Sequence, residues 1–332
     1  MKTQKLLSQY GIYLVLLALV AFFSIASSVF LTPANLFNIL RQVSIVGIAA
    51  VGMTFVMLTG GIDLSVGSIL ALVGVLCAMM MVRLGMNPWL AAVIAVGIGT
   101  VCGLINGFII CQLSIPPLIA TLGMMTVWRG VAFLITNGMP VYGFPEVFTK
   151  LGQGYIWIIP IPVVVMALCF AAGWFVLNRF SFGRYVYGIG GNEEASRLSG
   201  VNVNRVKYLV YTLAGFLFGI AGVMLLSRTN SGQPKAGSSA EMDIITAVVL
   251  GGISIKGGEG KITGVIAGVL IMGVLSNGMI ITNTGDYVQR VVSGLVLIAA
   301  VGFDIYSQKR RETRASVAEP RRSQGLESGK PG

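Results

Sequence analysis

Long apolar segments recur along almost the whole chain, and they constrain its fold more than any other feature of the sequence. Crossing a bilayer as a helix takes about 20 mostly apolar residues. Inside the bilayer every backbone polar group needs an internal partner, which a helix provides. The sequence therefore predicts an all-α, polytopic transmembrane bundle of about ten helices. The apolar segments lie roughly at 11–30, 42–58, 66–84, 88–112, 116–136, 156–178, 207–227, 243–255, 262–282 and 287–306.

A low content of charged residues supports an integral membrane protein. The chain of 332 residues is 55% hydrophobic and 11% charged, whereas a soluble domain carries about 25% charged residues. Glycine occurs 44 times, which suits helices that pack closely in a membrane. Several apolar segments are short or glycine-rich, so a count of about eight to ten true spans stays open. The segment 243–255 is the weakest of them.

The distribution of Lys and Arg predicts the orientation of the chain. With both termini inside, most of the 23 Lys and Arg residues fall on one side, in the N-terminus, the loop 179–207, the turn 256–261 and the tail. Positive loops mark the cytoplasmic side, so the net charge of +11 reflects topology and not a nucleic-acid partner. We expect residues 1–308 to form the transmembrane domain and the polar tail 309–332 to be a disordered cytoplasmic segment.

The residue types present argue against catalysis and against a bound cofactor or metal. The chain has no histidine, which is the commonest general base and metal ligand. Its four cysteines lie in apolar segments without the spacing of a metal site. The stretch Gly257–Lys261 lacks the spacing of a phosphate-binding loop, and we interpret it as a tight cytoplasmic turn. We therefore predict a protein that is not an enzyme and that holds no cofactor itself.

A polar segment of helical character separates the sixth and seventh apolar segments. Glu193 and Arg197 have the spacing of an ion pair on one helical face. Ala195 and Leu198 supply a small apolar face, and Gly200 can end the helix. These features are typical of a peg that enters a groove on a partner protein. A helix that lies on the membrane surface is the alternative.

Two glycines, Gly60 and Gly61, can break the chain between the second and third apolar segments. Asp63 and Ser65 follow them and resemble caps for a helix that starts near Val66. An acidic residue between two apolar spans is costly unless it is capped, paired or hydrated. Helix capping is the simpler interpretation, and a role in a gate or its hinge is the alternative.

Polar residues inside the predicted spans are further candidates for function. Asn106 lies in the fourth segment and Asn277 in the ninth, and such groups usually face the interior of a bundle or a wet cavity. Arg129, in the fifth segment, is more typical of a partner for an ion pair or for backbone carbonyls than of a ligand-binding residue. We interpret Asp243 as a residue at a helix end.

Several stretches of the chain resemble the membrane permease subunits of bacterial ATP-binding-cassette importers for monosaccharides, the ribose-type group. They follow one another in the order expected for that family, over most of the chain, and together they are highly specific for it. The stretches are Gly47–Val56, Gly60–Ser68, Pro116–Met125, Gly188–Val201 and Gly251–Ile255 with Gly257–Gly260.

This resemblance implies a fold similar to that of the vitamin B12 importer permease, and a function in moving a ribose-like monosaccharide across the bacterial inner membrane. It implies three kinds of partner: a second permease subunit, identical or paralogous, a cytoplasmic ATPase that binds ATP and magnesium, and a periplasmic sugar-binding protein. The loop at about 179–207 resembles the family's segment for coupling to the ATPase. Its candidate residues are Gly191, Asn192, Glu193, Ala195, Arg197, Leu198, Ser199 and Gly200.

The gate or translocation path is predicted with less support from any motif. Its candidates are Gly60, Gly61, Asp63, Ser65, Asn106 and Asn277. The alternative function is that of a secondary sugar transporter driven by an ion gradient. Such a protein normally carries several carboxylates inside the membrane, and the spans of this chain are poor in them. Ribose, allose, xylose, rhamnose and related polyols all stay open as substrates.

Overall fold

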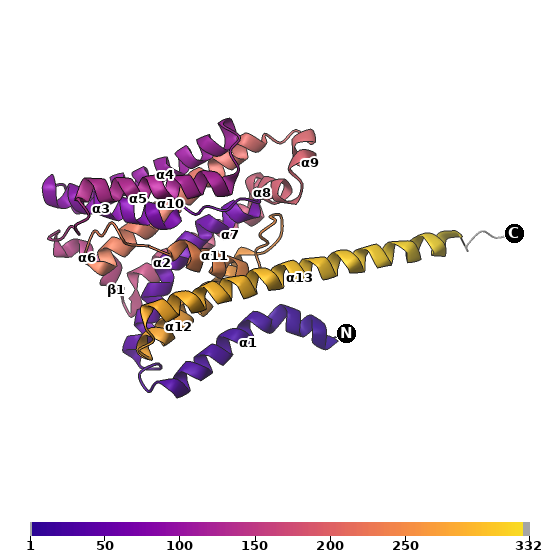
Figure 1. The fold of residues 1–332 in the computed structure, drawn as a ribbon, viewed down its shortest axis with the longest axis horizontal. Helices are drawn as coiled ribbons and strands as arrows, with labels where there is room; N and C mark the ends of the chain where they lie inside the picture. The colour runs from indigo at the N-terminus through magenta and orange to yellow at the C-terminus, as the bar shows by residue number, and fades with distance from the viewer. Residues whose placement is uncertain (1, 328–332) are drawn as a thin grey trace.

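Helices make up nearly all of the structure, a computed structural model that describes the backbone of residues 2–327 and the side chains of residues 11–306 (Figure 1). Within this described part the only sheet is a two-stranded antiparallel hairpin. The prediction of an all-α bundle is confirmed. The elements are α1 (Lys2–Ala26), α2 (Pro33–Leu58), α3 (Val66–Arg83), α4 (Pro88–Gln112), α5 (Pro117–Thr136), α6 (Glu146–Gln153), β1 (Tyr155–Ile156), β2 (Ile159–Pro160), α7 (Ile161–Arg179), α8 (Ser181–Gly191), α9 (Glu193–Leu198), α10 (Val203–Thr229), α11 (Ala240–Leu250), α12 (Ile262–Ile281) and α13 (Asp286–Glu327).

Most of the predicted spans are single helices. In the described part of the chain, 8 helices are long and apolar enough to cross a membrane, and α1 adds a shorter apolar stretch, Gly11–Ala26. Local signals move some boundaries away from the apolar runs. Thus α2 begins at Pro33, because proline fits the first helical turn and the Thr32 side chain accepts a hydrogen bond from the backbone N–H of Asn35. The helix therefore starts well before the predicted run 42–58.

The weakest predicted span, 243–255, is wrong as a crossing helix. Its helix, α11, has 11 residues and ends at Leu250. At 1.5 Å per residue it is roughly 16 Å long, about half the hydrocarbon thickness of a bilayer. Gly252, with a φ of +85°, turns the chain out of the helix, and its N–H donates to the Val249 carbonyl at 2.8 Å.

The irregular segment 230–239, which leads into α11, runs back along α3. Gly232 lies against Ala78, and further along Gly237 lies against Gly67. These contacts follow α3 from its middle to its first turn. Since α3 crosses the membrane, the segment dips into the membrane thickness before α11 starts. Irregular backbone at that depth is tolerated where protein surrounds it or where it lines a wet cavity.

Arg129 on α5 supplies polar partners to this irregular segment. Its Nη1 donates to the carbonyl oxygens of Pro234 at 2.9 Å and of Ala236 at 2.6 Å. Hydrogen bonds from a charged donor are stronger than neutral ones. Because these two carbonyls belong to a non-helical segment, no helical hydrogen bond satisfies them, and Arg129 does so instead. The interpretation of Arg129 as a partner for backbone carbonyls is confirmed.

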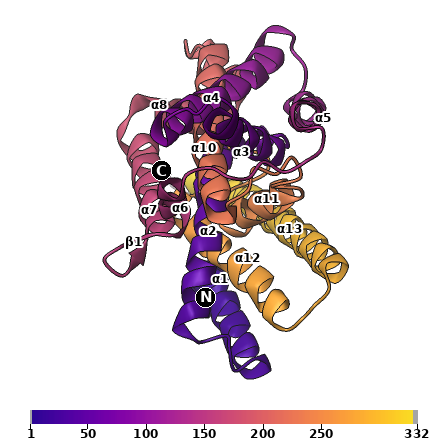
Figure 2. The same ribbon diagram turned by 90° about the vertical axis from the view of Figure 1, so that its left-hand side faces the viewer.

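The centre of the bundle is α10, which packs against α4, α2 and α3 (Figure 2). Glycines make the contact with α4 very close. A Cβ atom added to Gly99 would lie 2.8 Å from both the Gly215 carbonyl oxygen and the Gly219 Cα. Small residues allow such an approach, and the dispersion contacts that it brings hold membrane helices together.

Both ends of the described chain point the same way. α1 begins, and α13 ends, toward the end of the bundle where α8 and α9 lie (Figure 1). The backbone of α13 continues as helix to Glu327, over most of the tail 309–332 for which the sequence predicts disorder. Residues 328–332 lie outside the described residues. The division into a domain of residues 1–308 and a disordered tail stays a prediction.

Candidate functional site

The coupling candidates form a short helix whose two ends are fixed by local hydrogen bonds. At the start of α9, the Asn192 side-chain oxygen accepts a hydrogen bond from the Ala195 N–H at 2.9 Å, as expected of asparagine at this position. At its end, Gly200 has a φ of +85°. The N–H groups of Gly200 and Val201 donate to the carbonyls of Arg197 (3.0 Å) and Ser196 (3.1 Å), a Schellman ending that needs this left-handed residue.

The short helix α9 projects from the bundle and buries no side chain of its own among the described residues (Figure 1). Leu198 is 81% exposed, so the described chain covers little of its apolar side chain. Beside it an open hollow of about 420 Å³ lies on the same surface; it is lined by Arg197, Gly200, Val201, Asn202, Val203 and Asn204. The segment thus offers a protruding apolar residue next to a polar recess, so a partner could be held by both.

Glu193 anchors α9 to the base of α10. One carboxylate oxygen accepts from Arg197 Nη2 at 3.1 Å and the other from Lys207 Nζ at 2.7 Å. The predicted pair with Arg197 is confirmed. The pair with Lys207 was missed, because it joins residues 14 positions apart across a turn. Glu193 is 42% exposed, so each pair contributes only modestly, about 0.2–1 kcal/mol, and its main effect is to orient α9.

Asp63, Ser65 and Asn106 form one buried polar cluster between α2, α3 and α4. The backbone N–H and the hydroxyl of Ser65 both donate to Asp63 Oδ1, at 2.9 and 2.6 Å. Asn106 Nδ2 donates to Asp63 Oδ2 at 3.2 Å and to the Ser65 hydroxyl at 2.8 Å. Burial raises the pKa of the Asp63 carboxyl above its ordinary value, although the hydrogen bonds from Ser65 and Asn106 lower it.

The predicted capping is confirmed for Asp63, whose side chain accepts the backbone N–H of Ser65, and is wrong for the Ser65 side chain. α3 does begin at Val66, and Ser65 is its N-cap residue, but the Ser65 side chain makes no capping hydrogen bond to the described first turn. Its hydroxyl donates to Asp63 instead, because a buried carboxyl group without hydrogen-bond donors is costly. Gly60 ends α2 with a φ of +78°, as the prediction of a break at Gly60 and Gly61 requires.

The cluster has two polar atoms without a hydrogen-bond partner in the described structure, Asn106 Oδ1 and the Tyr211 hydroxyl. Tyr211, on α10, is almost fully buried and lies against Gly61, where an added Cβ would be 2.5 Å from its hydroxyl. The sequence analysis missed Tyr211, since nothing in its local sequence distinguishes it from a packing residue. One atom is an acceptor and the other can donate, so a buried water would suit this position.

Asn277 belongs to a different contact. Its amide and that of Asn35 exchange hydrogen bonds, with Nδ2 to Oδ1 distances of 2.9 and 3.0 Å. Both side chains are buried. The pair therefore joins α12 to the first turns of α2, and it lies apart from the Asp63 cluster with which the sequence analysis grouped it.

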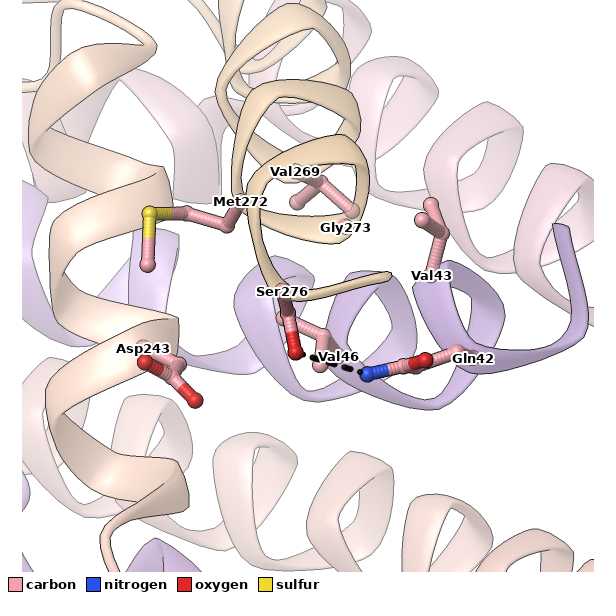
Figure 3. A pocket seen from close by; sticks show the side chains of 8 residues that line it. All are labelled: Gln42, Val43, Val46, Asp243, Val269, Met272, Gly273 and Ser276. Carbon is pink, nitrogen blue, oxygen red and sulfur yellow. Dashed lines mark hydrogen bonds between the residues drawn. The ribbon is translucent and has the colours of Figure 1, made fainter. Parts of the chain in front are cut away.

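A small cavity, which has three polar side chains in an otherwise apolar lining and which we call the polar cavity, lies between α2, α11 and α12 (Figure 3). Gln42 and Ser276 face Asp243 across it, and Gln42 Nε2 donates to the Ser276 hydroxyl at 3.1 Å. Val43, Val46, Val269, Met272 and Gly273 complete its walls. Its volume of about 30 Å³ suits a water molecule and not a sugar. Gln42 and Ser276 were not predicted as functional residues, although each is a polar residue in a long apolar run.

No group of three or more His, Cys, Asp or Glu side chains with the arrangement of a metal site occurs among the described residues. The four cysteines are free. Most of the polar side chains described above pair with one another or with the backbone.

Comparison with known proteins places the chain among transport proteins. Residues 35–301 match the family described as branched-chain amino acid transport system/permease component. The ribose import permease protein RbsC of Bacillus subtilis is 48% identical over 300 residues, which cover 90% of this chain and 93% of that protein. The protein of the same name from Escherichia coli is 45% identical over 87% of this chain and 91% of its own length.

Relatives with other names are somewhat less similar. The L-arabinose transport system permease protein AraH of Escherichia coli is 40% identical, over 92% of this chain and 93% of its own length. The fructose import permease protein FrcC of Rhizobium meliloti is 38% identical, over 88% of this chain and 84% of its own length. No solved structure matches the chain significantly.

Proposed function

Because the chain belongs to this family of multi-pass transport permeases, we propose that it is the membrane subunit through which an ATP-binding-cassette importer moves a ribose-like monosaccharide. The family description mentions branched-chain amino acids, but the named relatives at 38 to 48% identity take sugars. The observation that carries the proposal is the high identity, over about nine tenths of both chains, to two ribose import permeases. The arabinose and fructose permeases are less similar.

The energy for transport comes from ATP bound with magnesium on a separate cytoplasmic ATPase subunit. The chain lacks a phosphate-binding loop of its own. α9 is the docking element for that subunit, through the coupling residues Gly191–Gly200. Its capped ends, its exposed Leu198 and the recess beside it support docking.

The orientation follows from the same element. If α9 meets the ATPase, both chain ends are cytoplasmic, since α1 begins and α13 ends toward that side (Figure 1). The excess of Lys and Arg on this side supports the assignment. The opposite end, with α6 and the β1–β2 hairpin, receives the periplasmic sugar-binding protein. A second permease subunit, identical or paralogous, completes the path in the bacterial inner membrane.

The gate candidates take two separate roles in this proposal. Gly60, Gly61, Asp63, Ser65 and Asn106 form a hinge at the cytoplasmic end of α2, held by the hydrogen bonds of the buried cluster. Asn277 holds α12 against α2 through its hydrogen bonds with Asn35. The polar cavity in Figure 3 is the closed remnant of the path, because Gln42, Asp243 and Ser276 bring hydrogen-bonding groups to it that could exchange their present partners for sugar hydroxyls.

The test is ATP hydrolysis and sugar uptake by the permease reconstituted with its ATPase and binding protein. Loaded binding protein should stimulate hydrolysis, and ribose should work better than arabinose or fructose. Leu198→Asp should abolish assembly with the ATPase, whereas Leu198→Met should retain it, because only the first change puts a charge into the docking contact. Uptake driven by an ion gradient without any ATPase would overturn the proposal in favour of a secondary transporter.

A further inference from the structure

Three glycine pairs from distant parts of the sequence meet at the cytoplasmic end of the bundle. The first pair follows the last turn of α2, the second forms the end of α8, and the third lies in the turn between α11 and α12. We call them the glycine joint. The joint consists of Gly60–Gly61, Gly190–Gly191 and Gly257–Gly258.

The backbones in the joint touch directly. A Cβ on Gly190 would collide with the carbonyl oxygen of Leu58 and the backbone N of Gly258. One on Gly257 would lie 2.6 Å from the Gly60 backbone N and 3.0 Å from the Gly190 Cα. The Gly258 N–H donates to the Leu58 carbonyl at 2.9 Å. The end of α8 thus lies tightly between α2 and the α11–α12 turn. No side chain lies between these backbones that could change its conformation to make room.

Two further contacts hold α8 in place, one to the α11–α12 turn and one to α2. The Tyr187 hydroxyl donates to the Gly260 carbonyl at 3.0 Å, in the α11–α12 turn. The Phe182 ring stacks on Phe55 of α2, with centroids 6.3 Å apart and an interplanar angle of 29°. α8 leads into α9 at Asn192, which ends one helix and caps the next. A displacement of α9 therefore reaches α8 within one residue.

The joint also lies at the ends of the helices that close the polar cavity. Gln42 is on α2, Asp243 on α11 and Ser276 on α12. α2 ends in the joint, and α11 and α12 are connected through it. A movement of the joint changes the relative placement of all three helices, and with it the size of the cavity in Figure 3.

From these contacts we infer that the glycine joint transmits movement of the coupling helix α9 to the helices around the polar cavity. Gly190 is its central positioning residue. This inference rests on the proposed function, because it takes α9 as the site where the ATPase acts. Backbone packing without side chains makes the transmission stiff, since backbone atoms cannot relax by changing rotamer.

The chain provides a matched pair of variants to test this role. Gly190→Ala inserts a methyl group into the joint, whereas at Gly97 in α4 an added Cβ has open space around it in the described structure. Both are glycine-to-alanine changes within a helix, and neither position has a left-handed φ. Gly97 lies outside both the joint and the coupling segment, so this variant controls for the added methyl group itself.

The measurement is the amount of sugar transported per ATP hydrolysed, in proteoliposomes with ATPase and binding protein, together with assembly of the permease with the ATPase. For Gly190→Ala we expect normal assembly and continued hydrolysis, with transport per ATP reduced at least about tenfold, within the usual range of coupling between sites. Gly97→Ala should stay within about twofold of wild type. A purely structural role would lower assembly and hydrolysis along with transport and leave the ratio unchanged.

If Gly190→Ala fails to fold, Tyr187→Phe tests whether the glycine joint transmits movement from α9. It removes only the hydroxyl that binds the Gly260 carbonyl, so transport per ATP should fall by roughly fivefold, as for the loss of about one neutral hydrogen bond. If Gly190→Ala transports as much sugar per ATP hydrolysed as the wild type, the proposed role of the glycine joint is wrong. Where Gly190→Ala does not fold, a wild-type value in Tyr187→Phe leads to the same conclusion. Failure of the wild-type permease itself to assemble with the ATPase would instead refute the proposed function.

Discussion

Removing the Arg129 guanidinium should loosen the irregular segment before α11 without unfolding the bundle. Arg129→Met keeps an unbranched apolar stem in place of the arginine stem and deletes the two hydrogen bonds to the Pro234 and Ala236 carbonyls. A hydrogen bond to a charged group contributes about 1.5–3 kcal/mol. Arg129 is only partly buried, so the lower value applies to each bond, and the segment should lose about 3 kcal/mol of local stability.

Amide hydrogen exchange measures this loss directly. Inside the segment, the N–H of Gly232 donates to the Val141 carbonyl and the N–H of Ala236 to the Gln233 carbonyl. A loss of 3 kcal/mol should reduce the protection of these amides by roughly 100-fold, since each 1.4 kcal/mol is a factor of ten. The α4–α10 contact should keep its wild-type exchange and serves as the internal control.

A lysine at the same position provides the second control. Arg129→Lys keeps the positive charge, but a single ammonium group on a shorter side chain cannot hold two carbonyls in the fork geometry of a guanidinium. We expect protection between that of the wild type and that of Arg129→Met. Wild-type exchange of Gly232 and Ala236 in Arg129→Met would refute the reasoning, because it would mean that the carbonyls do not depend on this donor.

Three other changes test separate contacts. Glu193→Gln removes both ion pairs of α9, so binding-protein-stimulated ATP hydrolysis should fall severalfold while the thermal midpoint stays near that of wild type; an unchanged rate would show that α9 needs no anchor. Gly103→Leu should prevent folding because its side chain would enter the backbone of α10, whereas Gly97→Leu, with open space in the described structure, should fold; detergent-stable yield measures both. Asp63→Asn should remove a pH dependence: burial raises the folded-state pKa, so the wild type is fully stable below the unfolded pKa of about 3.9 and loses stability as pH rises through the folded value. The stability advantage of the variant should therefore grow with pH in that window, and a constant difference would contradict the assignment.

The helix ends and membrane spans that the sequence predicted correctly depend on residues that are close together in the chain. The start of α9 follows from Asn192, whose side chain caps the first turn after it. The end follows from Gly200, because glycine adopts a left-handed φ easily. Both signals are contained within a few residues, so they can be read without knowing the fold. The apolar runs are equally local, because a run of about 20 residues can satisfy its backbone as a helix whatever its neighbours are.

Tertiary contacts account for what was missed. The apolar run of 243–255 looks like a short span, but its true depth depends on the segment 230–239 lying along α3, and no local pattern specifies that contact. Asp63 and Asn106 were each singled out, yet their pairing joins residues 43 positions apart. The same holds for Glu193 with Lys207. The sequence identified Asp63, Asn106 and Glu193 one by one, and only packing shows which residues they meet.

The polar contacts inside the bundle differ in how easily they can open, and this difference indicates where a path would form. Asn35 and Asn277 hold each other with two hydrogen bonds, and Asp63 accepts three. Gln42 and Ser276 share a single neutral bond of 3.1 Å, which contributes about 1 kcal/mol net. This weakest contact is also the one that borders a cavity. A hydroxyl-rich guest can replace it with equivalent hydrogen bonds, so opening there costs least, and the stronger pairs on either side keep the helices together while it happens.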